Sequence, residues 1–219
     1  MQLIKPRFKI MSIMSGNKSL ILIEEAGRTC YKSEDKITEN SAPKFVTNIL
    51  RRGHESVIEH SAMTVRFVVD RGVTHELVRH RLCAFSQENT RYCNYKGGVT
   101  FVIPPWLPLI AGCYENMADY QIQANQYGSC EYGEDIWFNQ MLSAETEYIR
   151  LLTIGWSPQQ ACSVLPNSLK TEIVVTTNFR EWRHIFSLRC SEAAHTQMRE
   201  IMLPLRNKVR TMIPIIFDS

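Results

Sequence analysis

Stretches rich in β-branched residues alternate with amphipathic helical patterns along this chain, and this alternation limits the folds open to it. Residues 62–70 (AMTVRFVVD) and 169–178 (LKTEIVVTTN) have the composition that favours strands, and each stretch is followed by a helical pattern. No repeat, low-complexity tract or linker divides the 219 residues, a length that suits one sizeable core. We therefore predict a single α+β domain over residues 1–219.

Turn and cap residues place the remaining elements. Ser41 and Pro43 open a helical pattern that Gly53 closes, and Ser157 and Pro158 open a shorter one. The other expected elements are an edge strand through Ile13, helices over 17–32 and 72–81, a strand over 98–105, two helices with a loop between 114 and 154, and helices over 179–189 and 193–210.

Composition excludes several classes of protein. The net charge of +3 is too small to indicate nucleic acid or a membrane surface as a partner. Seven cysteines without a CxxC pair indicate reduced thiols, not a disulfide framework or a zinc knuckle. No stretch approaches the roughly 20 apolar residues of a membrane span. Three basic residues interrupt the first fourteen, so we expect no signal peptide and a cytoplasmic protein.

The common motifs for phosphate binding and nucleophilic catalysis are absent. There is no GxGxxG after a strand, no GxxxxGK[ST] and no GxSxG, and no cysteine lies in a nucleophile signature. In HESVIEH (54–60) the histidines are six apart, whereas a zinc-binding HExxH needs them four apart, so we predict no metal site. Any phosphate or anionic ring bound by this chain must be bound by arginines.

The stretch RHRLCAFSQENTRY (79–92) concentrates such groups. We expect Arg79, His80 and Arg81 at the end of a helix, where cations complement the helix dipole and stay solvated. They also point in different directions, no acid follows before Glu88, and each guanidinium can hold a phosphate or a pair of carbonyls. The residues alone leave both explanations open.

A second basic cluster lies in TNFREWRHIFSLR (177–189). Arg180 and His184 are four apart and share a helical face, with Asn178 near the cap and Arg189 at the far end. An ordinary amphipathic helix explains the same pattern, with its arginines outside and a core of Phe179, Trp182, Ile185, Phe186 and Leu188. Two arginine-rich helix ends suit a large anionic cofactor and a nucleotide, but they suit plain surface as well.

Four blocks in order, GHESVIEH, RHRLCAFSQENTRY, VLP and TNFREWRHIFSLR, closely resemble the flavin-dependent thymidylate synthases. The family signature is RHR, seven residues, Ser, one residue and Arg-Tyr. The resemblance runs from about residue 20 to 205. It implies an α+β fold with a mostly antiparallel sheet and flanking helices, assembled as a homotetramer with shared active sites.

The resemblance also implies a reaction. Deoxyuridylate (dUMP) is methylated reductively at C5, with FAD as hydride carrier, NADPH as reductant and 5,10-methylenetetrahydrofolate as carbon donor. No cysteine attacks the pyrimidine in this family, which agrees with the absence of a nucleophile signature. Fixed cations would stabilise the negative charge of a reduced flavin.

Residue by residue, the resemblance assigns three sets of contacts. Arg189 matches the catalytic arginine that lies against the uracil and favours its ionised form; the alternative for it is a cation at a helix C-terminus. His54 and Glu59 match residues beside the flavin and its folate partner; a helix-terminal histidine and a surface acid are their alternatives. The full FAD set is His54, Ser56, Glu59, Arg79, His80, Arg81, Gln87, Asn178, Arg180 and His184, and the nucleotide set is Glu76, Arg79, Gln87, Glu88, Asn89, Thr90, Arg91, Cys162 and Arg189.

Two positions depart from the family pattern. Asn89 stands where the signature has Ser, and Cys162 stands where the family usually has an Arg that contacts dUMP. A thiol replaces neither the charge nor the fork of a guanidinium, and one charge-assisted contact contributes roughly 1.5–3 kcal/mol. A lesser departure is Glu76, where Gln also occurs. The chain is then an ordinary thymidylate synthase, a methylase of another pyrimidine nucleotide such as UMP, or a flavin-binding paralogue; a basic RNA-binding module is the rival from a different class.

Overall fold

The computed structural model describes residues 1–120 and 132–218, and it confirms the predicted mixed α+β class with antiparallel pairing and flanking helices. The chain divides into two compact units, and its course passes between them several times. The prediction of one domain over residues 1–219 stays a prediction. The first unit comprises Met1–Arg7, Val68–Leu77 and Ser86–Ile173, and the second comprises Phe8–Phe67, Val78–Phe85 and Val174–Ser219.

A three-stranded sheet organises the first unit. Its central strand is β1 (Gln2–Ile4), which pairs in parallel with β5 (Thr100–Val102) and antiparallel with β6 (Gly112–Cys113). Strand β5 is shorter than the expected 98–105, because two prolines follow it and neither can donate to a ladder.

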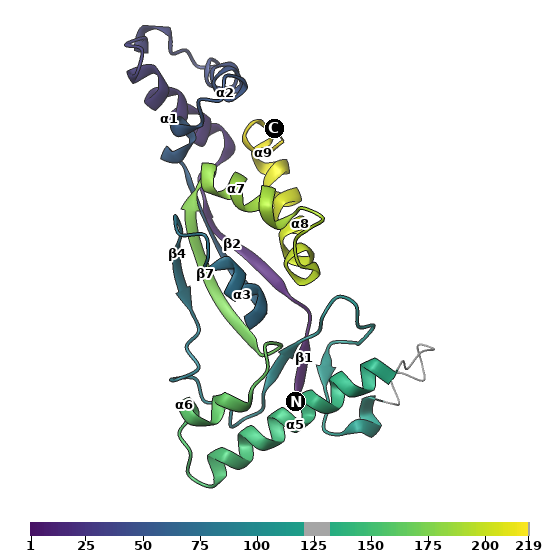
Figure 1. Cartoon of the computed structure of the whole chain (residues 1–219). Coiled ribbons are helices and arrows are strands. Elements are labelled where there is room, and N and C mark those ends of the chain that lie inside the picture. The colour runs from purple at the N-terminus through teal and green to yellow at the C-terminus, as the bar shows by residue number, and fades with distance from the viewer. Residues whose placement is uncertain (121–131, 219) are drawn as a thin grey trace. The chain divides into compact units, whose positions relative to one another are not determined.

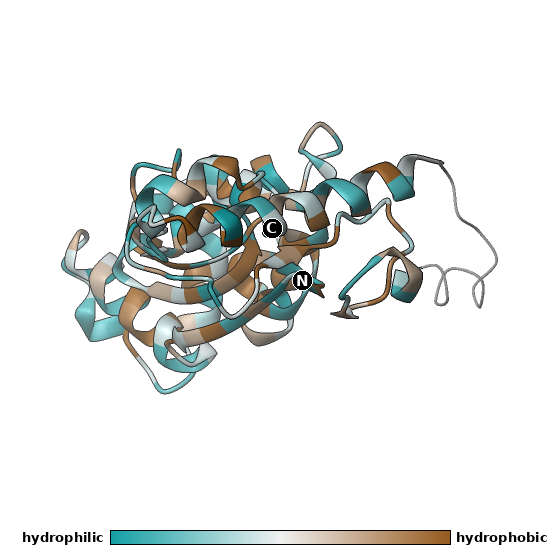
Figure 2. Ribbon diagram, turned by 90° about the horizontal axis from the view of Figure 1, so that it is seen from below, coloured by the Kyte–Doolittle hydropathy of each residue, from teal (hydrophilic) through white to brown (hydrophobic). Residues whose placement is uncertain are grey.

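Helix α5 (Tyr132–Thr153) completes the core of the first unit. Figure 2 shows hydrophobic and hydrophilic residues alternating along this helix. It is the second of the two helices expected between 114 and 154. Residues 117–120 are helical, residues 114–116 are not, and the rest of the first expected helix lies outside the described residues. The largest buried side chains of this core are Leu3, Phe101, Tyr114, Tyr120, Phe138 and Tyr148.

The N-terminal stretch forms two strands instead of the single edge strand expected. The break falls at Lys5 and Pro6, and proline both fixes its own backbone and lacks an N–H. The second piece, β2 (Arg7–Ile13), is indeed an edge strand of a four-stranded sheet. That sheet has the order β2-β3-β7-β4, with β3 (Ala62–Asp70), β7 (Lys170–Asn178) and β4 (Ala84–Gln87).

Helices dominate the second unit. Helix α7 packs against α8 and against the short 3-10 helix η2, and α1 packs against α2 (Figure 1). Trp182 is fully buried among them, and its indole N–H donates to the Met63 carbonyl at 3.0 Å. The bounds are α1 (Gly16–Thr29), η1 (Glu34–Lys36), α2 (Ala42–Arg51), η2 (Glu55–His60), α7 (Phe179–Arg189), α8 (Thr196–Met212) and α9 (Pro214–Phe217).

Capping explains where several helices begin. The Asn178 side chain accepts from the Glu181 backbone N–H at 2.9 Å, so α7 starts directly at the end of β7, as the sequence predicts (Figure 1). In α6 (Pro158–Ala161), Ser157 and Gln160 form a capping box, and η3 (Cys162–Val164) follows. Ser41 does not cap α2 with its side chain; its hydroxyl donates to Glu24 at 2.7 Å instead.

Two further expectations were wrong in detail. Helix α3 (Arg71–Leu77) ends before the RHR triplet, which lies in the turn that leads to β4. Leu188 is 47% exposed, whereas the other four residues proposed for the core face of α7 are buried. Within the described part of the chain, no helix has the length and apolar character needed to cross a membrane.

Candidate active site

The turn after α3 gives the three residues of the RHR triplet different environments. Arg79 and Arg81 are exposed, whereas His80 is only 6% exposed. The Thr177 hydroxyl holds this turn by donating to the Leu82 carbonyl at 2.9 Å. The triplet is therefore not a row of solvated cations at a helix end, because its middle residue points into the second unit.

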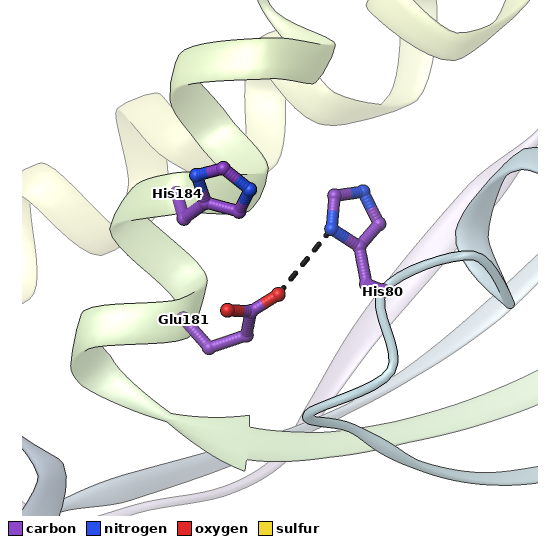
Figure 3. Close-up of side chains that lie close together, drawn as sticks. All are labelled: His80, Glu181 and His184. Atoms are coloured by element: carbon purple, nitrogen blue, oxygen red, sulfur yellow. Dashed lines mark ion pairs between the residues drawn. The ribbon is translucent and has the colours of Figure 1, made fainter.

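His80 links an acid to an arginine. Its Nδ1 lies 3.3 Å from Glu181 Oε1, and its Nε2 accepts a hydrogen bond from Arg189 Nε at 3.0 Å. Nε2 therefore carries the lone pair, so Nδ1 carries the proton and donates to the carboxylate. Figure 3 shows His80 reaching Glu181 from the turn, with His184 one turn further along α7. The chain Glu181–His80–Arg189 fixes the direction of the arginine side chain.

The surroundings keep His80 neutral. Burial lowers its pKa below the ordinary value, and the positive charge of Arg189 lowers it further, while Glu181 acts in the opposite direction. A neutral imidazole is what the two hydrogen bonds require, since an imidazolium would have no lone pair to accept from Arg189.

Arg180 and His184 share an exposed face of α7, as their spacing predicts. Arg180 Nη1 donates to Glu59 Oε1 at 2.6 Å, and Arg183 Nη2 lies 3.1 Å from Glu55 Oε1. The hydrogen bond from Arg180 to Glu59 raises the pKa of the guanidinium. Helix η2 thus presents two acids to the basic face of α7.

A groove of about 690 Å³ lies along this face, within the range of ligand pockets. Arg180, His184 and Ser187 offer exposed donors, and Leu82 offers apolar contact. A flavin ring presents carbonyl oxygens and ring nitrogens as acceptors, so this donor set fits it. The lining residues are Glu55, Glu59, Leu82, Arg180, Glu181, Arg183, His184 and Ser187.

The ligand types of His80, Glu181 and His184 also suit a metal ion, and their ligand atoms lie within 4.8 Å of one another. The Arg189 guanidinium, however, already donates to His80 Nε2 at 3.0 Å. A divalent cation would meet that positive charge directly, so the arrangement favours a relay of hydrogen bonds over a metal centre.

The other residues predicted for FAD are spread over both units. Asn178 is occupied as the cap of α7, while His54 and Ser56 are exposed at and just after the start of η2. The hydroxyl of Tyr31 lies 3.4 Å from His54 Nδ1. Gln87 belongs to the first unit, where its amide donates to the Thr74 hydroxyl at 3.0 Å.

Glu88 is the centre of a polar network in the first unit. It accepts from Lys170 Nζ and from the Tyr95 hydroxyl, each at 2.9 Å. Burial and the bond to Glu88 raise the pKa of Tyr95. Burial alone would lower the pKa of Lys170, but its hydrogen bonds to Glu172 and Glu88 raise it on balance. Glu88 thus accepts hydrogen bonds from both a cation and a phenol.

The remaining residues predicted for the nucleotide are mostly near the surface of the first unit. Glu76 and Thr90 are half-buried in α3 and after β4, and Arg91 is exposed with its guanidinium 5.4 Å from the Tyr92 ring centre. Cys162 is half-buried in η3, and its thiol lies 3.2 Å from the Gln159 carbonyl. Asn89 accepts from the Arg91 backbone N–H at 2.9 Å, which closes a turn after β4.

Sequence reasoning missed Glu181, Glu55 and Arg183. A usable signal existed for Glu181, because it lies three residues before His184 and therefore on the same side of α7. For Glu55 and Arg183 no signal was available, since their pairing depends on how η2 meets α7.

Comparison with known proteins settles the family. The family model described as "Thymidylate synthase complementing protein" matches residues 10–215. The chain belongs to this family. A flavin-dependent thymidylate synthase of Corynebacterium aurimucosum is 33% identical over 206 residues, which cover 93% of this chain and 80% of the relative. One of Geobacter sulfurreducens is 30% identical, covering 88% and 78%.

Solved structures show the same fold. The crystal structure of the UMP/dUMP methylase PolB from Streptomyces cacaoi, bound with 5-Br dUMP, superposes with a TM-score of 0.74 at 21% identity, covering all of this chain and 96% of that one. Family membership makes the chain an enzyme of the methyltransferase class. It also implies FAD, NADPH and 5,10-methylenetetrahydrofolate as cofactor, reductant and carbon donor.

Proposed function

We propose that this protein is a thymidylate synthase that converts dUMP, methylenetetrahydrofolate, NADPH and a proton to dTMP, tetrahydrofolate and NADP⁺. The family match over residues 10–215 and the names of the relatives support this reaction. The observation that carries it is the buried relay Glu181–His80–Arg189, which holds at one end the arginine matched to the uracil.

Arg189 acts on the pyrimidine in this proposal. A guanidinium beside the uracil stabilises negative charge on the ring and so makes C5 more nucleophilic. Its effect depends on direction, because a fixed donor does not have to reorganise as charge develops. His80 supplies that fixed direction through Nε2, and Glu181 holds His80 through Nδ1.

The groove along α7 is the proposed flavin site. When bound, FAD supplies hydride transfer between NADPH and the transferred methylene group. Arg180 and His184 would donate to the flavin, with Arg180 exchanging its hydrogen bond to Glu59 for the ligand. The further FAD contacts proposed from the resemblance are His54, Ser56, Arg79, Arg81, Gln87 and Asn178.

The proposed contacts to the nucleotide come from residues 87–91, together with Glu76 and Arg79. Glu88 is already engaged by Lys170 and Tyr95, so its role there is to accept from the substrate or to keep the network in place. Cys162 lies where the family arginine contacts dUMP, and this chain has no guanidinium at that position. Assembly as a homotetramer with shared active sites and a cytoplasmic location are also proposed, from the resemblance.

The product mass tests the reaction. The purified protein is incubated anaerobically with FAD, NADPH and methylenetetrahydrofolate, with dUMP and UMP in competition. The expected result is that the mass of dUMP increases by one methyl group. No gain on either nucleotide from a protein that holds flavin would contradict the proposal and favour a paralogue without this activity. A colourless protein that shifts RNA in a salt-dependent manner would revive the RNA-binding alternative.

One second function has specific support. Cys162 stands where the family usually has an arginine that contacts dUMP. The chain also shares its fold with PolB, which is described as a UMP/dUMP methylase. A methyl gain on UMP in the same competition would identify this chain as a methylase of ribonucleotides, and Asn89 and Cys162 would then be specificity changes.

A further inference from the structure

A second groove of about 600 Å³ lies in the second unit and shares no lining residue with the groove along α7. The end of α1, the loop that follows it and one side of α2 form its walls, and His54 lines it as well. All of its lining residues fall between 28 and 54, so the groove belongs to one compact unit.

The charged side chains that line this groove are all basic. Arg28, Lys44 and Arg52 line it, and among the described residues no acidic side chain does. Arg28 is paired with the buried Glu24 at 2.8 Å, which leaves Lys44 and Arg52 as the exposed cations. Two cations without an acid between them favour a ligand group with about two negative charges, such as a phosphate monoester.

The groove also offers flat surfaces and amides. Tyr31 is 60% exposed, and the Arg28 guanidinium lies 4.5 Å from the centre of the Phe45 ring. Aromatic rings and guanidinium planes stack on purines. Asn48 carries an amide that can pair with the N6 and N7 edge of adenine. A purine with a phosphate beside it matches all three features.

We propose that this groove binds the 2′-phosphoadenosine end of NADPH. Lys44 and Arg52 pair with the 2′-phosphate, Tyr31 and the Arg28–Phe45 stack cover the adenine, and Asn48 reads its edge. The choice of NADPH as the ligand rests on the proposed function. FAD carries an adenosine without a 2′-phosphate, so a dianionic phosphate monoester is a group that NADPH has and FAD lacks. His54, matched to the flavin side by the resemblance, lines the same groove.

Equilibrium binding to the FAD-loaded protein tests this site without turnover. Titration calorimetry with 2′,5′-ADP and with NADP⁺ should show roughly tenfold weaker binding for Arg52→Gln, and weaker again for Lys44→Gln combined with it. Binding of 5′-AMP, which lacks the 2′-phosphate, should stay unchanged. Arg51→Gln is the matched control, because Arg51 is exposed on the same helix but does not line the groove.

Anaerobic reduction of the flavin by NADPH gives the kinetic readout. The Arg52→Gln protein should need roughly tenfold more NADPH for half-maximal reduction, with the limiting rate retained, and NADH should be affected little. Equal binding of 2′,5′-ADP by Arg51→Gln and Arg52→Gln would overturn the site, as would loss of FAD or of methylenetetrahydrofolate affinity in place of NADPH affinity.

Failure of this inference and failure of the proposed function are separable. A protein that makes dTMP but binds 2′,5′-ADP independently of Arg52 refutes the groove alone. A protein that binds 2′,5′-ADP through Arg52 but methylates no nucleotide refutes the thymidylate synthase reaction and leaves the phosphate site in place.

Discussion

Replacing Glu181 tests whether the buried carboxylate orients Arg189 through His80. Glu181 and His80 are 8% and 6% exposed, and the atoms that join them are 3.3 Å apart. Glu181→Gln keeps an acceptor for His80 Nδ1 but removes the charge. Glu181→Ala removes the acceptor as well, so His80 can rotate and Arg189 loses the fixed Nε2.

The distance between His80 Nδ1 and Glu181 Oε1 sets the size of the effect expected on kcat. A hydrogen bond to a charged group contributes about 1.5–3 kcal/mol, and N–H···O bonds are usually about 2.7–3.2 Å long. At 3.3 Å the lower end applies, so Glu181→Ala should lose about 1.5 kcal/mol. If that energy positions Arg189 in the transition state, kcat falls about tenfold. Glu181→Gln, which keeps a neutral bond, should lose about 0.5–1 kcal/mol, or a factor of about two to five.

The assay is kcat and KM for dUMP between pH 5 and 9, with Glu192→Gln as the control because Glu192 is an exposed acid just beyond α7. Glu181 is a group that raises the pKa of His80, so its removal lowers that pKa further. The acidic limb of the rate profile should therefore move to lower pH in Glu181→Gln. A Glu181→Ala protein with wild-type kcat and an unmoved acidic limb would refute the orienting role, whatever its melting temperature.

The remaining predictions concern four other side chains. Arg189→Ala should nearly abolish methylation while flavin absorbance is retained; undiminished turnover would rule out its role at the uracil. Cys162→Arg should tighten dUMP binding by roughly tenfold or more in calorimetry, since it restores one charge-assisted contact; an unchanged affinity would mean that another residue makes the contact. His80 has a lowered pKa when folded, so the unfolded chain binds more protons below the ordinary value of 6.5, and stability should fall as the pH drops through that value. Denaturation at pH 7.5 and 5.5 should show this loss, and His80→Gln should reduce it. Burial raises the pKa of the Cys83 thiol to about 11, so at pH 8 it should alkylate far more slowly than the exposed Cys30; equal rates by mass spectrometry would contradict that burial.

Local patterns predicted what depends on local physics. Strand β7 alternates buried and half-buried residues along its whole length, and Asn178 caps the helix that follows, so the junction was predictable to the residue. Ser157 and Pro158 marked the start of α6 for the same reason, and Ser157 does cap that helix. Arg180 and His184 are four residues apart, so the helical period alone predicted that they share one face of α7.

Tertiary contacts decided what the sequence could not. The pattern over 72–81 predicted a helix but not its end at Leu77. In the turn beyond that end, the Thr177 hydroxyl donates to the Leu82 carbonyl across 95 positions. The partners of His80 lie 101 and 109 residues further along, so its burial could not be seen in the RHR triplet. Solvated cations were a fair interpretation for Arg79 and Arg81, which are exposed, and the wrong one for His80.

The two departures from the family pattern differ in what the structure offers for them. Asn89 accepts from the Arg91 backbone N–H and so closes the turn after β4, a role that a serine performs more weakly because its side chain is shorter. The turn therefore gives Asn89 a local reason to be present, independent of the nucleotide. Nothing comparable supports Cys162, whose thiol contacts only the Gln159 carbonyl of the preceding short helix α6 among the contacts described above. If the substrate differs from dUMP, Cys162 is the position at which the difference should be sought first, since it removes a charge that no contact of its own replaces.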